Sequence, residues 1–276
     1  MFEYDFMNRA LFVGLCISLL CPCIGIFMVL RKSSMVGDTM SHASLAGIAL
    51  GMLSGMNPIA GSFLFTALCG ALIEGLRKYF PHHLDLILTI TLSLSAGTAI
   101  TILSSGLIRG NANAFFFGSI LTVTPADMIG IALLTGFSLF LLALFYDSLV
   151  CITYDEEAAR VAGVRVDLFS YIFALIMAAA VSISIKIVGV LVLSSMIALP
   201  VAGALQLEKG FRATLLWSMV LSLLSMMIGL MGSFFFDAAP GGLVALSSVA
   251  LLLIIIAGKQ WKKVLSKQKI PRGGSL

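Results

Sequence analysis

The chain has 276 residues, of which 60% are hydrophobic and only 11% are charged, with a formal net charge of +4. Soluble domains carry about 25% charged residues, so this composition excludes a soluble domain and indicates a polytopic membrane protein. The modest positive charge is no indication of nucleic-acid binding, because the basic residues fall mostly in short loops and at the C-terminus, as membrane topology requires.

Windows of about 20 apolar residues predict about nine membrane spans. In chain order they cover residues 10–30, 39–56, 58–77, 86–108, 127–146, 168–185, 187–206, 213–236 and 241–258. The first window is too long for the core of a signal peptide and has no clear A-x-A cleavage site, so we interpret it as a retained span. The predicted fold is an all-α, polytopic transmembrane helical bundle, forming a single domain over residues 1–276.

Basic residues recur in alternate loops between these spans. They lie at 31–32, 77–78, 160–165 and 209–212, and again in the tail at 259–276. The positive-inside rule then predicts a cytoplasmic C-terminus and an N-terminus outside. The intervening loops are poor in charge, with Arg109 and Lys186 as exceptions.

The second predicted span begins with D-T-M-S-H-A-S-L-A-G-I-A-L-G at residues 38–51. In a helix, Asp38 and His42 share one face and lie about 6 Å apart along the axis. A carboxylate and an imidazole are ligands of first-row divalent metals, and ionisable groups in membrane helices usually mark a transport path. Asp38 could instead be an N-cap or first-turn acid, and His42 could be hydrogen-bonded within the bundle.

The loop charges put Asp38 near the cytoplasmic end of its span instead of at the midplane. A broken or re-entrant segment would bring it deeper, since non-helical backbone is tolerated where it lines a cavity. Between the fourth and fifth spans, residues 110–127 are apolar but short and are bounded by Gly, Asn and Pro. They predict a short interfacial or re-entrant helix. The five cysteines do not form a metal-cage pattern.

The polar loop from Asp147 to Asp167 contains a predicted helix of at most two turns at residues 155–163. Its sequence has an N-capping acid, an acidic first turn, alanines and a terminating glycine. The residues assigned to it are Asp155, Glu156, Glu157, Ala158, Arg160 and Gly163. So short a helix is unstable alone in water, so it docks either on a soluble partner or on its own bundle. The loop charges place it in the cytoplasm.

The seventh predicted span is unusually polar. Ser194, Ser195 and Pro200 give it hydroxyl groups and a kink, which could line a path or could serve packing alone. The chain contains no H-E-x-x-H and no G-x-x-x-x-G-K-[ST] motif, so it does not bind ATP by a P-loop.

Four stretches of the chain resemble the ABC-3 family of permeases, the membrane subunits of bacterial zinc, manganese and iron importers. They are residues 37–51, 116–121, 155–164 and 188–204. Their order and separation match over essentially the whole chain. The resemblance implies a type II ABC importer-like bundle in the bacterial plasma (inner) membrane. It also implies that Asp38 and His42 belong to the metal path and that residues 155–163 are the coupling helix, which sits in a groove of the ATPase.

The same resemblance implies partners. Family members pair as homodimers or heterodimers, bind two ATPase subunits inside and receive metal from an extracytoplasmic binding protein. ATP hydrolysis is then expected on a separate chain. No permanently bound cofactor is expected, only the transported Mn, Zn or Fe ion. The alternatives are a proton-coupled secondary metal carrier without an ATPase, a structural scaffold, or an intramembrane metalloenzyme, which would need a third ligand and a general base.

Overall fold

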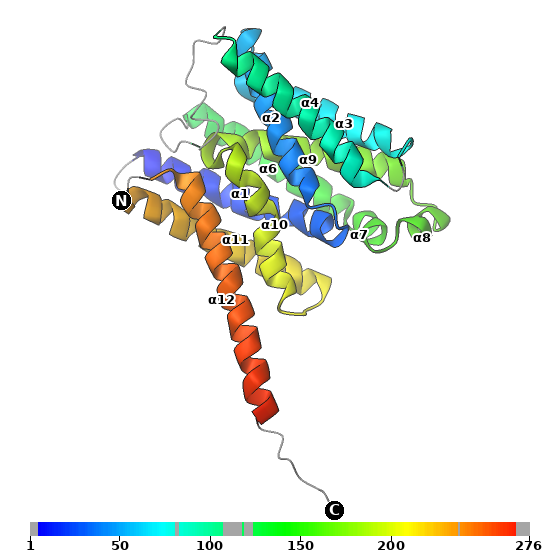
Figure 1. Cartoon of the computed structure of the whole chain (residues 1–276), viewed down its shortest axis with the longest axis vertical. Helices are drawn as coiled ribbons and strands as arrows, with labels where there is room; N and C mark the ends of the chain where they lie inside the picture. The colour runs from blue at the N-terminus through cyan, green and yellow to red at the C-terminus, as the bar shows by residue number, and fades with distance from the viewer. Residues whose placement is uncertain (1–4, 81–82, 107–117, 119–123, 237, 269–276) are drawn as a thin grey trace, which may run out of the picture.

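The computed structural model describes residues 5–80, 83–106, 118, 124–236 and 238–268, and all regular structure within them is helical (Figure 1). The all-α prediction is therefore confirmed. The helices are α1 (Asp5–Leu30), α2 (Met35–Leu53), α3 (Pro58–Arg77), α4 (Leu84–Ser104), α6 (Pro125–Leu144), α7 (Tyr146–Tyr154), α8 (Glu156–Val161), α9 (Val166–Val188), α10 (Val190–Leu205), α11 (Phe211–Phe236) and α12 (Pro240–Gln268). Most of the predicted helix at 110–127 lies outside the described residues.

The predicted number of about nine spans is not supported. Among the described residues, six helices are long and apolar enough to cross a membrane: α1, α3, α4, α9, α11 and α12. The count rises to seven if α6 and α7, which are bent by 66° at a short break, form one broken span. The other two predicted spans correspond to α2, whose apolar character Asp38 and His42 reduce, and to α10, which has only 16 residues. The chain is nonetheless a multi-pass membrane protein.

Neighbouring helices cover most of the surface of the polar helix α2. It packs against α3, α4, α9 and α10, and in Figure 1 it lies between the α3–α4 pair and α10. Small residues allow this packing. A Cβ atom built on Gly47 would lie 2.5 Å from the carbonyl oxygen of Gly61 on α3 and 2.6 Å from the Cα of Ser62. The predicted close packing of small residues in this helix is therefore confirmed.

The remaining helices form a second group around α1. Helix α1 packs against α6, α10 and α11, and α12 packs against α10 and α11. Close approach again depends on glycine: a Cβ on Gly25 would collide with the carbonyl oxygen of Ile197, and one on Gly229 with Val244. The C-terminal part of α12 extends away from the bundle (Figure 1).

Hydroxyl groups connect helices inside the apolar bundle. Ser62 on α3 donates a hydrogen bond of 3.0 Å to Ser182 on α9, and both side chains are buried. Several other buried serines bond within their own helix, as Ser41 does to the carbonyl oxygen of Gly37 at 2.7 Å. Such pairing satisfies polar groups where water cannot reach them, so α3 and α9 are held in register beside α2.

Candidate functional site

Asp38 and His42 lie one turn apart on α2 and share its one accessible face. From Val36 to Ala49, every other side chain of this helix is buried, whereas these two are half-buried. The N-cap position is Ser34, so Asp38 is a first-turn acid and not the cap. Neither side chain has a hydrogen bond or ion pair within the described part of the chain. The alternative of a hydrogen-bonded core histidine is thus not observed, and both groups are free to bind an ion.

Two ligands alone make an incomplete metal site. In the described residues no group of three or more His, Cys, Asp and Glu side chains could hold a metal ion. Helix α2 is also continuous from Met35 to Leu53, so no break carries Asp38 deeper. Zinc prefers four ligands, and a site with two per chain must complete itself from elsewhere or bind weakly.

The predicted path residues lie on α10, which packs directly against α2. Ser194 and Ser195 are half-buried, and Pro200 is buried inside the helix. Their position beside α2 makes them candidates to line the same passage. Their role in a path stays a prediction.

The predicted short helix is present as α8. The Asp155 carboxylate accepts a hydrogen bond of 2.9 Å from the Ala158 amide, which is the predicted N-cap, and Gly163 follows the helix with φ +85°. Ala159 is fully buried and packs with Ile152 and Val166, so α8 docks on its own bundle. Its outer face leaves Val161 90% exposed. An apolar side chain this exposed at a docked helix is available to a partner.

One part of the polar loop differs from the sequence prediction. Residues Tyr146–Tyr154 form helix α7, with Leu149 and Ile152 buried. The polar residues Asp147, Thr153 and Tyr154 obscured the apolar face of this helix. Helix α7 turns away from α6 by 66° and leads into α8, which packs against α7 and α9.

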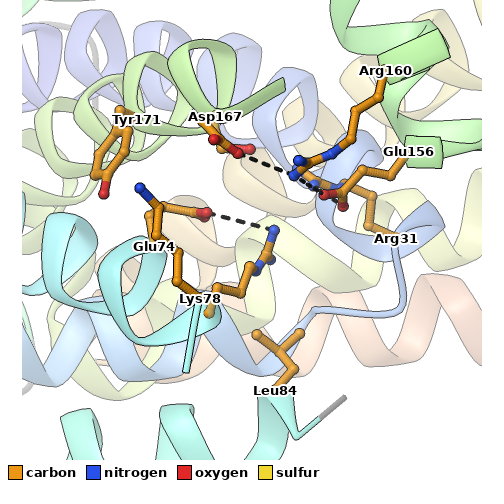
Figure 2. A pocket seen from close by; sticks show the side chains of 10 residues that line it. Arg31, Glu74, Lys78, Leu84, Glu156, Arg160, Asp167 and Tyr171 are labelled. Atoms are coloured by element: carbon orange, nitrogen blue, oxygen red, sulfur yellow. Dashed lines mark hydrogen bonds and ion pairs between the residues drawn. The ribbon is translucent and has the colours of Figure 1, made fainter. Parts of the chain in front are cut away.

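A charged pocket of about 590 Å³ lies against α8 (Figure 2). The charged residues lining it come from the α1–α2 turn, α3 and its C-cap, α8 and α9. They are Arg31, Glu74, Arg77, Lys78, Glu156, Arg160 and Asp167. Glu74 is not among the residues predicted from the sequence to be functional. An acid near the end of an apolar span, three residues before Arg77, is the signal that could have found it.

Ion pairs connect the walls of this pocket. Arg31 Nη2 lies 3.4 Å from Glu156 Oε2, and Arg160 Nη2 lies 3.3 Å from Glu156 Oε1 and 3.1 Å from Asp167 Oδ1. Figure 2 shows these side chains pointing toward one another. Burial lowers the pKa of the Arg31 guanidinium, and the nearby charge of Arg77 lowers it further, while Glu156 and Glu74 oppose both effects. The pocket therefore holds a desolvated cation that depends on its acidic neighbours.

We expect Asp155→Ala to weaken α8. Losing an N-cap costs about 1 kcal/mol of helix stability, equivalent to about a fivefold shift in equilibrium, whereas Asp155→Ser keeps a capping oxygen. If α8 is the contact for an ATPase, affinity for that subunit, measured with the detergent-solubilised permease, falls about fivefold in Asp155→Ala and little in Asp155→Ser. Equal affinity in both variants and the wild type would show that the cap does not matter.

Solved structures identify the class of fold. The structure of PsaBC from Streptococcus pneumoniae in complex with a Fab matches with a TM-score of 0.81 and 24% identity, covering 92% of this chain and 91% of that one. An inward-facing metal-chelate type ABC transporter matches with a TM-score of 0.69 and 15% identity, covering 91% and 85%. The chain has the fold of an ABC transporter membrane subunit.

Sequence comparison then names the family. The model of the ABC 3 transport family matches residues 3–259, and the chain belongs to this family. A probable metal transport system membrane protein of Treponema pallidum is 46% identical over 257 residues, covering 93% of this chain and 97% of that protein. The zinc uptake membrane protein ZnuB of Haemophilus influenzae is 30% identical, covering 91% and 97%, and the manganese permease ScaB of Streptococcus gordonii is 27% identical, covering 94% of each chain.

Proposed function

We propose that this chain is the membrane-spanning permease subunit of an ATP-binding cassette importer that moves Zn²⁺, Mn²⁺ or Fe²⁺ into the cytoplasm. The observation that carries the proposal is the pair Asp38 and His42, the two accessible side chains on an otherwise buried stretch of α2. A carboxylate and an imidazole suit all three metals, and relatives are named for zinc, manganese and iron transport. The chain itself is not an enzyme, and ATP hydrolysis belongs to a separate subunit.

A pair of permease chains would complete the metal site. Two copies of Asp38 and His42 facing each other across a two-fold axis supply four ligands, the number that zinc prefers. Each pair lies on the accessible face of α2, where a second copy of this chain or a related permease can approach. Transient coordination of this kind suits a transporter, which must also release its cargo. An extracytoplasmic binding protein delivers the ion.

Helix α8 is the proposed coupling helix, with residues 155–163 facing the ATPase. Its inner face is anchored by Ala159, and its outer face offers Glu157, Ala158 and Val161 to a partner. The basic loops at 31–32 and 77–78 lie beside α8 at the charged pocket, which supports one cytoplasmic side for all three. The N-terminus then lies outside, and the basic tail at 259–276 lies in the cytoplasm.

Metal uptake in cells that lack their own importers tests the proposal. The chain is expressed with its candidate ATPase and binding protein, and zinc, manganese and iron are supplied separately. We expect uptake of at least one metal that disappears when the ATPase is omitted. Uptake that continues without the ATPase and collapses with the proton gradient would instead establish the secondary carrier.

A further inference from the structure

Arg31 connects two parts of the molecule that are far apart in sequence. It lies in the turn between α1 and α2, with its side chain only 14% exposed, and it pairs with Glu156 on α8. The turn is tightly formed. Lys32 has a φ of 55°, and both the amide and the hydroxyl of Ser33 donate to the carbonyl oxygen of Met28, at 3.0 and 3.2 Å. A displacement of Arg31 therefore moves the start of α2.

The other ion pairs of α8 do not reach α2. Arg160 pairs with Glu156 on α8 itself and with Asp167 at the start of α9. Apolar packing likewise joins α8 to α7 and α9, through Ile152 and Val166. Within the described part of the chain, the Arg31–Glu156 pair is thus the one ion pair between α8 and the turn that begins α2.

The pair is costly to separate. The Arg31 side chain is largely removed from water and lies close to the like charge of Arg77. If Glu156 moved away with α8 and Arg31 stayed, a buried guanidinium would lose a counter-charge and keep a repulsive neighbour. The lower-energy response is for Arg31 to follow Glu156. Arg31 is seven residues before Asp38, and the continuous helix α2 carries the displacement to the metal ligands.

We propose that Arg31 is a positioning residue, whose ion pair with Glu156 transmits movement of α8 to α2 and so couples the ATPase cycle to the Asp38–His42 site. This inference rests on the proposed function, because it takes α8 as the ATPase contact and α2 as the metal-binding helix. Arg31 touches neither the metal nor the ATP.

A charge exchange tests the link in the complete transporter. The permease and its ATPase are reconstituted in proteoliposomes with the binding protein, and uptake of Zn²⁺, Mn²⁺ and Fe²⁺ is measured together with ATP hydrolysis. Arg31→Glu places a carboxylate opposite Glu156, so we expect the number of ions imported per ATP to fall about tenfold. Hydrolysis itself persists, because the surface for the ATPase is intact. The double variant Arg31→Glu/Glu156→Arg restores much of the ratio.

Lys32→Glu is the matched control. It makes the same charge change in the same turn, but Lys32 is exposed and has no ion pair within the described residues, so the ratio stays near that of the wild type. If the double variant imported as few ions per ATP as Arg31→Glu, or if Lys32→Glu did so, the role of Arg31 would be overturned. The proposed function would be unaffected by either result. A wild-type complex that imports none of the three metals would overturn the proposed function and this inference with it.

Discussion

Alanine at position 38 or 42 is expected to abolish metal uptake while leaving the protein folded and in the membrane. Loss of a group that only supports a metal ligand lowers metal affinity or activity by about 10- to 100-fold. Loss of Asp38 or His42 itself should therefore lower uptake by at least about 100-fold. The bundle should tolerate the change, since neither side chain has a partner within the described residues and both are half-buried. Uptake is measured in whole cells, with protein level determined in the same membranes.

Asp85→Ala is the control for this prediction. Like Asp38, Asp85 is an acid in the first turn of an apolar helix, but it lies exposed at the start of α4. A first-turn acid contributes about 0.3–1 kcal/mol through the helix dipole, so its loss leaves uptake nearly unchanged. If Asp38→Ala behaved like Asp85→Ala, Asp38 would be a helix-stabilising acid and not a metal ligand.

The largest effect on stability is expected from Gly47→Val. The Cβ atom of any residue that replaces Gly47 would lie 2.5 Å from the carbonyl oxygen of Gly61 and 2.6 Å from the Cα atom of Ser62, both on α3. Neither backbone atom can rotate away. Helices α2 and α3 must then separate, which disrupts the close packing of small residues between them. Overpacking in a core typically costs about 1–3 kcal/mol, and a backbone collision belongs at or beyond the upper end of that range.

Gly97→Val in α4 is the control for this prediction. It has the same effect on helix propensity as Gly47→Val but causes no backbone collision. Gly97 is also in an apolar span, but a Cβ atom there has open space within 4 Å. We expect detergent-solubilised Gly47→Val to lose its monodisperse peak or to melt well below the wild type, with Gly97→Val close to the wild type. Equal melting temperatures for the two variants would contradict the close α2–α3 crossing.

The sequence contained enough information for the helical class and for the capped helix α8, because both depend on local patterns. Apolar windows locate spans. A capping acid, an acidic first turn, alanines and a terminating glycine define a short helix. The predicted number of spans was higher than the six or seven of the described residues for two reasons: Asp38 and His42 lower the hydropathy of α2, and α10 has only 16 residues.

The charged pocket could not be predicted from the same information. Arg31 and Glu156 are separated by 125 positions, and no local pattern connects a turn residue with an acid on a distant helix. As single residues, Arg31 and Arg77 fit the positive-inside rule fully, so nothing in the sequence indicated a second role. Only the folded bundle shows that α7 brings α8 back to the turn where α2 begins.

The most direct test of the proposed importer is uptake by proteoliposomes that contain the permease, its ATPase and the binding protein, with no proton gradient. The predicted result is accumulation of one of Zn²⁺, Mn²⁺ or Fe²⁺ when ATP is supplied on the ATPase side, and none with a non-hydrolysable analogue. Equal accumulation with and without ATP hydrolysis would contradict an ATP-driven importer.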